Sequence, residues 1–134
     1  MKKSRINSSG FAERMGSYSH GYKVDLGNTE IIFTTGQLAL DKNGKVVAPN
    51  DIAAQTEFVF ESLQKILKEA NSSLDDVVKA TIFVTDMDDF KLVSPIRNKY
   101  FKISKPVSTL VEVSKLVTEG CKVEIEVIAV KQKG

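Results

Sequence analysis

The segment from Lys122 to Val130 constrains the fold most, because apolar and polar residues alternate along it before it turns mostly apolar. Side chains on a strand point alternately to its two faces, so this alternation predicts a strand. One face carries Val123, Ile125, Val127 and Ala129, and the other carries Glu124, Glu126, Ile128 and Val130. Carboxylates beside large apolar side chains suit a binding site or a subunit interface; the alternative is a solvated sheet face with a few apolar residues.

Other segments share the strand signature of β-branched or alternating side chains. They are residues 18–26, 30–35, 76–85 and 106–113. Gly27-Asn28 is a usable hairpin turn between the first two, and Gly120 is a turn residue between the last strand candidate and Lys122. Residues 35–37 break the second strand, which resumes at residues 38–40.

Two helices are expected between these strands. Asn50 or Asp51 caps the first, which runs to about Ala70 with apolar residues at three- and four-residue spacing. The second ends near Phe101. Proline is tolerated at the first helical position and disfavoured further in, so Ser94-Pro95 places the start of the regular second helix near Ser94.

The expected order is therefore strand, strand, helix, strand, helix, strand, strand, in one domain spanning residues 1–134, with residues 1–17 as a loose N-terminal arm. Two helices can cover only one face of such a sheet. The uncovered face is expected to carry Ile32, Phe83, Leu110, Ile128 and Val130. An apolar patch of this kind predicts an oligomer whose sheets meet.

The composition gives no support for several classes of function. The chain has 134 residues, 42% hydrophobic and 27% charged, which is typical of a soluble domain. A net charge of +2, from 19 basic and 17 acidic residues that are scattered along the chain, gives no reason to expect nucleic-acid or membrane binding. Cys121 and His20 are the only residues of their kinds and form no recognisable zinc set. With no apolar run of roughly 20 residues and no signal-peptide core at the start, a cytosolic protein is expected.

Five segments, spread over nearly the whole chain, carry a family resemblance. They are Gly16 to His20 (GSYSH), Phe33 to Gln37 (FTTGQ), Ser73 to Phe90 (SLDDVVKATIFVTDMDDF), Val111 to Val113 (VEV) and Val123 to Val130 (VEIEVIAV). As a set they resemble the RidA family, also called YjgF or endoribonuclease L-PSP. The resemblance implies the chorismate-mutase-like α+β fold (ββαβαββ) and a homotrimer with three ligand clefts between subunits. Members that act as enzymes hydrolyse 2-imino acids, made by pyridoxal-phosphate enzymes, to 2-oxo acids and ammonia, and require no metal or cofactor.

That reaction needs a cation for the substrate carboxylate, a polar group that positions water, and an apolar wall. By resemblance, Glu124 matches the water-handling glutamate, Tyr18 matches a tyrosine that closes the cleft, and Thr35 and Gly36 match the Ser-Gly of the loop lining it. The alternative for each is structural: a solvated glutamate, a packed tyrosine and a turn glycine. Leu110, expected on the face of Glu124, is a further candidate substrate-binding residue.

The chain departs from the family pattern at the carboxylate-binding position. Active members read Pro-Ala-Arg-Ser before the Val-Glu-Val segment, where this chain reads Pro106-Val-Ser-Thr109, so Ser108 stands in place of the arginine. A hydroxyl in place of a guanidinium costs about 2–4 kcal/mol of carboxylate binding, which predicts weak 2-imino acid deaminase activity. Ser94 stands where an asparagine is usual.

Arg97 offers a way to restore the missing charge. Residues three apart on a helix share a face, so Arg97 is expected beside Ser94 and could return a guanidinium to the cleft. The alternative is a solvated or inter-subunit salt-bridge residue. Three functions remain open: an imine or enamine hydrolase, a trimer that binds a small metabolite without chemistry, and a ribonuclease, for which no basic stripe with aromatic residues is visible.

Overall fold

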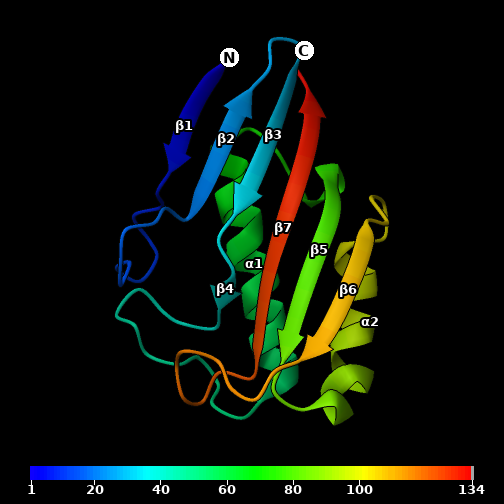
Figure 1. Cartoon of the computed structure of the whole chain (residues 1–134). Helices are drawn as coiled ribbons and strands as arrows, with labels where there is room; N and C mark the ends of the chain where they lie inside the picture. Colours follow the sequence, from blue (N-terminus) through cyan, green and yellow to red (C-terminus); the bar gives the residue numbers. More distant parts are fainter. Residues whose placement is uncertain (134) are drawn as a thin grey trace.

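The alternating segment forms the central strand of a mixed sheet in the computed structural model, which describes residues 1–133 (Figure 1). The strands are β1 (Lys2–Ile6), β2 (Gly21–Asp25), β3 (Thr29–Thr34), β4 (Gln37–Leu38), β5 (Val77–Val84), β6 (Val107–Glu112) and β7 (Val123–Gln132). Their order in the sheet is β1-β2-β3-β7-β5-β6, and the short β4 also pairs with β7. The pairing is antiparallel except between β5 and β6, which are parallel.

Both α-helices lie on one face of this sheet (Figure 1). They are α1 (Ile52–Glu69) and α2 (Phe90–Tyr100), and short 3₁₀ turns at Leu74–Asp76 and Met87–Asp89 precede β5 and α2. The apolar stripe of α1, including Val59, Leu63 and Ile66, is fully buried against the core face of β7. The predicted α+β architecture with two helices on one face of a mixed sheet is confirmed.

The local signals at the hairpin and at the first helix are confirmed. Leu26 donates its backbone N–H to the carbonyl of Thr29, which closes the hairpin between β2 and β3. Asp51 is the N-cap of α1, and its carboxylate accepts the backbone N–H of Ala54.

The prediction of a loose arm over residues 1–17 is wrong for its first part. Lys2–Ile6 form β1, which pairs antiparallel with β2 and gives the sheet its edge. The burial of Ile6 holds it there, because that side chain is only 7% exposed and lies close to Gly21 of β2. The four residues before Ile6 are exposed. A polar, Lys-rich segment is a common composition for an edge strand, which is why its sequence looked like an arm.

The predicted start of the second helix is also wrong. α2 begins at Phe90 and therefore contains Pro95 in its interior. Proline removes one helical hydrogen bond, the one that would reach the carbonyl of Lys91. Lys91 is exposed, so water can take that bond, while the fully buried Val93 anchors the first turns of the helix.

Two residues were assigned to the wrong face of the sheet. Ile32 is fully buried in the core, and Leu110 pairs with the fully buried Ile82 and packs against the core as well. The register sets the faces: Phe83 of β5 lies opposite both Glu124 of β7 and Val111 of β6. The uncovered face therefore carries the predicted Phe83, Ile128 and Val130 together with Phe33 and Val111, and we call these five residues the open-face patch.

Candidate functional site

Glu124 projects from the start of β7 against a glycine. The register places it opposite Phe83 of β5 and Leu38 of β4. A Cβ atom on Gly36 would lie 2.4 Å from Oε2 of Glu124, a distance that no real side chain tolerates. Gly36, which has no Cβ atom, therefore lets the loop between β3 and β4 pass directly over the carboxylate in this position.

This carboxylate opens into a hollow of about 640 Å³, here called the Glu124 hollow. Its walls include the predicted residues Tyr18, Thr35 and Gly36 as well as His20. The two residues of β4, the 40–44 and 117–118 loops and the N-terminal loop complete it: Phe11, Ala12, Glu13, Met15, Gln37, Leu38, Leu40, Lys42, Asn43, Gly44, Val117 and Thr118. Four of the eight site residues predicted from the sequence thus meet in one place.

Burial raises the pKa of Glu124 above its usual range, and the negative charge of Glu126 on the same strand raises it further. Removing a carboxylate from water disfavours its charged form. A carboxyl group with a raised pKa exchanges a proton more readily near neutral pH, which suits general acid–base chemistry. The arrangement can therefore position and activate a water molecule.

The N-terminal loop that carries Tyr18 is fastened by His20. Nδ1 of His20 accepts the backbone N–H of Ser8 at 2.9 Å, and its own backbone N–H donates to Oδ1 of Asn7 at 3.3 Å. The ring of Phe11 lies 5.0 Å from the imidazole. Burial lowers the pKa of His20, and the charge of Arg14 lowers it further. Sequence reasoning assigned this histidine no role, because only contacts across the loop reveal one.

A second hollow of about 490 Å³ lies where α2 leads into β6, and we call it the Arg97 hollow. Arg97 and Ser108 line it together with the cationic side chains of Lys102 and Lys105. Its other lining residues are Asn98, Phe101 and Pro106, so no carboxylate lines it among residues 1–133. The hollow is therefore electropositive.

Arg97 lies beside Ser94, as the helical spacing predicted. Nη2 of Arg97 donates to Oγ of Ser94 at 3.0 Å, and its Nε donates to Oδ1 of Asn98 at 3.2 Å. The guanidinium carbon also sits 5.8 Å from the ring centroid of Phe90, within the range of a cation–π contact. Three neighbours on one helix hold this guanidinium at the rim of the Arg97 hollow.

The two hollows lie on opposite faces of the sheet. Ser108 pairs with Ala80, which pairs with Val127 on the core face, whereas Glu124 belongs to the uncovered face. Leu110 shares the core face with Ser108 and lines neither hollow. Within residues 1–133 the two hollows have no lining residue in common. One chain alone does not bring Ser108 or Arg97 to Glu124.

Comparison with known proteins identifies the family. The family model described as endoribonuclease L-PSP matches residues 11–131. The chain belongs to the endoribonuclease L-PSP family. A RutC family protein of Pyrococcus abyssi is 40% identical over 118 residues, which cover 88% of this chain and 89% of that protein. The 2-iminobutanoate/2-iminopropanoate deaminase of Mus musculus is 34% identical over 117 residues, covering 87% and 83%.

Solved structures share the L-PSP family fold along the full chain. A putative endoribonuclease from Thermotoga maritima is 36% identical with a TM-score of 0.85 and covers 100% of both chains. TdcF of E. coli, solved with bound serine, is 30% identical with a TM-score of 0.81, covering 96% of this chain and 98% of that one. The resemblance inferred from the five sequence segments is thus confirmed.

Residues 1–133 contain no group of three or more His, Cys, Asp or Glu side chains placed to hold a metal ion. Within the same residues, neither α1 nor α2 combines the length and apolar character that crossing a membrane would need.

Proposed function

We propose that this L-PSP family protein hydrolyses reactive imines or enamines to a carbonyl compound and ammonia, with Glu124 handling the water. The observation that supports this most is the state of Glu124: it is partly buried, it has a raised pKa, and it faces a hollow lined by Tyr18, Thr35 and Gly36. A similar protein, from mouse, is named a 2-iminobutanoate/2-iminopropanoate deaminase.

The chemistry asks little of the protein beyond placing one water molecule. The carboxylate of Glu124 accepts a proton as the water oxygen attacks the imine carbon, and the C=N bond becomes a C–N single bond. Glu124 passes that proton to the nitrogen, which gives a neutral amino alcohol. The carboxylate then takes the hydroxyl proton as the C=O bond forms and the C–N bond breaks, and it hands this proton to the departing nitrogen, which leaves as ammonia. Atoms and charges therefore balance with water as the sole co-reactant.

We propose further that the reaction cleft forms between subunits of a homotrimer. Glu124 and Ser108 lie on opposite faces of one sheet, so a second copy of the chain must bring the Arg97 hollow to the Glu124 hollow. The open-face patch provides the apolar surface for such an assembly, with Phe33 40% and Val111 37% exposed. Around a three-fold axis each subunit gives one half of a site to one neighbour and the other half to the next.

The Arg97 hollow then supplies the charge for the substrate carboxylate. Ser108 offers only a neutral hydroxyl, but Arg97, Lys102 and Lys105 line the same hollow. A guanidinium can hold a carboxylate through two parallel hydrogen bonds, which an ammonium cannot do. The structurally similar TdcF was solved with bound serine, a small molecule that carries a carboxylate.

The test is ammonia release from freshly generated 2-iminobutanoate, with and without the protein. Glu124→Gln keeps the shape of the side chain and removes the base, so we expect a loss of roughly hundredfold or more. Glu126→Gln is the matched control, because it removes a carboxylate from the same strand and the same face. At a pH well above the pKa of Glu124, this control should retain the wild-type rate.

Two outcomes would overturn the proposal. Wild-type protein that releases ammonia no faster than buffer alone contradicts hydrolysis. If that protein still binds 2-oxobutanoate, the chain is a trimer that binds a small metabolite without chemistry. Equal activity of the Glu124→Gln variant and the wild type would remove Glu124 from the mechanism.

A further inference from the structure

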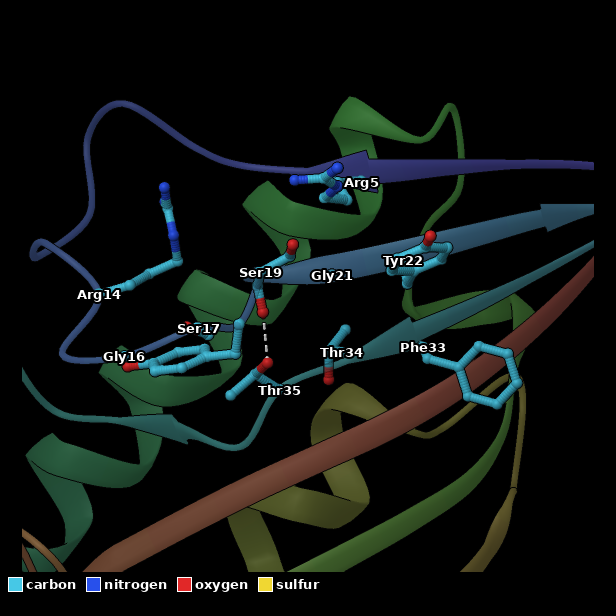
Figure 2. A pocket seen from close by; sticks show the side chains of 11 residues that line it. Arg5, Arg14, Gly16, Ser17, Ser19, Gly21, Tyr22, Phe33, Thr34 and Thr35 are labelled. Carbon is cyan, nitrogen blue, oxygen red and sulfur yellow. Dashed lines mark hydrogen bonds between the residues drawn. The ribbon is translucent and has the colours of Figure 1, made fainter.

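A third hollow of about 720 Å³ shares Tyr18 and Thr35 with the Glu124 hollow. Figure 2 shows the side chains that line it. We call it the Arg5–Arg14 hollow. It lies between the N-terminal loop and the adjoining parts of β1, β2 and β3, and it is lined by Arg5, Arg14, Gly16, Ser17, Tyr18, Ser19, Gly21, Tyr22, Phe33, Thr34 and Thr35. The proposed reaction uses neither of its arginines.

The strand register places Arg5 next to two aromatic rings. Arg5 of β1 lies opposite Tyr22 of β2, and Tyr22 lies opposite Phe33 of β3. Side chains at paired positions point to the same face, so all three lie on the uncovered face of the sheet. Figure 2 shows Arg14 on the loop that borders the same hollow, so the two guanidiniums come from separate segments.

Both guanidiniums are unengaged within residues 1–133. The salt bridges of this part of the chain involve neither Arg5 nor Arg14. Its hydrogen bonds from arginine side chains are those of Arg97. Among the same residues, no carboxylate lines the hollow. Each guanidinium offers five N–H donors, so two of them beside an apolar wall make an electropositive recess that suits an anion.

The remaining polar groups also suit an anion. Ser17, Ser19 and Tyr22 can each donate a hydroxyl proton into the hollow. The hydroxyl of Thr35 is not free, because it donates to the backbone carbonyl of Ser19 and thereby fixes the loop against the end of β3 (Figure 2). The recess thus combines charged donors, neutral donors and the exposed ring of Tyr22.

We propose that the Arg5–Arg14 hollow binds a small molecule through an oxyanion, either a carboxylate or a phosphate group. Arg5 and Arg14 hold the oxyanion by charged hydrogen bonds, and the ring of Tyr22 faces the rest of the molecule. Phe33 borders the recess from the open-face patch. This site stands apart from the cleft of the proposed reaction, where Arg97 holds the substrate carboxylate.

Calorimetric titration of the full chain with two probes, sodium phosphate and 2-oxobutanoate, tests this site at constant ionic strength. Arg5→Gln and Arg14→Gln should each weaken binding of the preferred probe by at least roughly tenfold. Lys3→Gln is the matched control, because it removes the same charge from an exposed residue of the same strand that does not line the hollow. It should bind like the wild type. All three residues are exposed, so thermal melting should be unchanged.

The probes separate the two sources of oxyanion: tight phosphate binding indicates a phosphate ligand, and tight 2-oxobutanoate binding indicates a carboxylate. The reaction cleft also takes 2-oxobutanoate, so the titrations are repeated on Arg97→Ala and Glu124→Gln. Arg97→Ala should weaken the binding step of the reaction cleft, and both variants should keep the separate binding step that Arg5→Gln weakens. The proposal is overturned if neither probe binds saturably at millimolar concentration, or if Lys3→Gln loses as much affinity as the two arginine variants. This experiment measures binding and not ammonia release. A failure of the proposed function would therefore leave its result unchanged.

Discussion

The Glu124 hollow and the Arg97 hollow are built in different ways. The first is made by backbone and by short contacts: Gly36 passes over Glu124, and a loop fastened by His20 carries Tyr18. The second is made by long side chains at the edge strand and the end of a helix, where Lys102 and Lys105 are exposed. Fixed geometry thus surrounds the carboxylate, and adaptable charge surrounds Ser108.

This difference indicates which of the two hollows tolerates amino-acid substitutions. A carboxylate that handles water must keep its position and its pKa, and both depend on burial that only packed surroundings provide. A cationic side chain that holds an anion can extend from any of several backbone positions, provided that it is long enough to reach the anion. A chain of this family can therefore carry a serine at position 108 and still place positive charge around it, as Arg97, Lys102 and Lys105 do.

The largest expected effect concerns the assembly that would join the two halves. Phe83→Asp places an unpaired charge in the open-face patch, which costs about 3–5 kcal/mol where such a charge is buried. We expect sedimentation at micromolar concentration to show a trimer for the wild type and smaller species for this variant. Leu92→Asp is the control, because Leu92 is exposed on α2. If the wild type is a monomer, no second subunit brings the Arg97 hollow to the Glu124 hollow, and the two cannot be halves of one site.

The next effect tests the fixed geometry of the Glu124 hollow. Gly36→Ala puts a Cβ atom 2.4 Å from Oε2 of Glu124 and must displace the carboxylate. We expect ammonia release to fall by roughly the hundredfold of losing the acid–base group. Gly10→Ala, where a Cβ atom meets nothing within 4 Å, should leave the rate unchanged. If Gly36→Ala keeps full activity, the contact has no role in catalysis.

A smaller effect is expected in the Arg97 hollow. Arg97→Ala should weaken binding of 2-oxobutanoate by at least roughly tenfold, or about 1.4 kcal/mol, measured with the trimer intact. Arg97→Lys should recover part of the affinity, because an ammonium keeps the charge without the fork. Lys91→Ala removes a charge from an exposed position on the same helix and should have no effect. Unchanged affinity in Arg97→Ala would make Arg97 a surface residue.

The smallest expected effect is a shift in pH dependence. The charge of Glu126 helps to raise the pKa of Glu124, so Glu126→Gln should lower that pKa. The reaction needs the ionised carboxylate, so activity rises with pH through the pKa of Glu124. The acid limb of the kcat/KM profile should therefore move to lower pH in this variant. An acid limb at the wild-type pH would show that another group controls it.

The sequence predicts most elements of this fold because their signals are local. Alternation identified β7, three- and four-residue spacing identified α1, and Gly27-Asn28 identified the hairpin. β1 was missed because an exposed edge strand carries few apolar residues. The side on which Leu110 points was also missed, since it depends on the parallel register of β6 on β5 and not on the strand's own pattern.

The site was less accessible to sequence reasoning for a related reason. Glu124 stood out because a carboxylate beside apolar residues is unusual. The contact between Gly36 and Glu124 and the hydrogen bond from Ser8 to His20 join residues that are not neighbours in the chain. No pattern in the sequence predicts such contacts. The separation of Ser108 from Glu124 likewise follows from the pairing of three strands.

The central claim, that the Glu124 hollow of one subunit and the Arg97 hollow of another make one site, is tested most directly by mixing variants. Glu124→Gln and Arg97→Ala are each assayed alone, then dissociated and reassembled together in equal amounts. If the halves come from different subunits, about a quarter of all sites regain both residues after random reassembly, and ammonia release exceeds that of either parent. A mixture no more active than the mean of its parents would contradict the shared site.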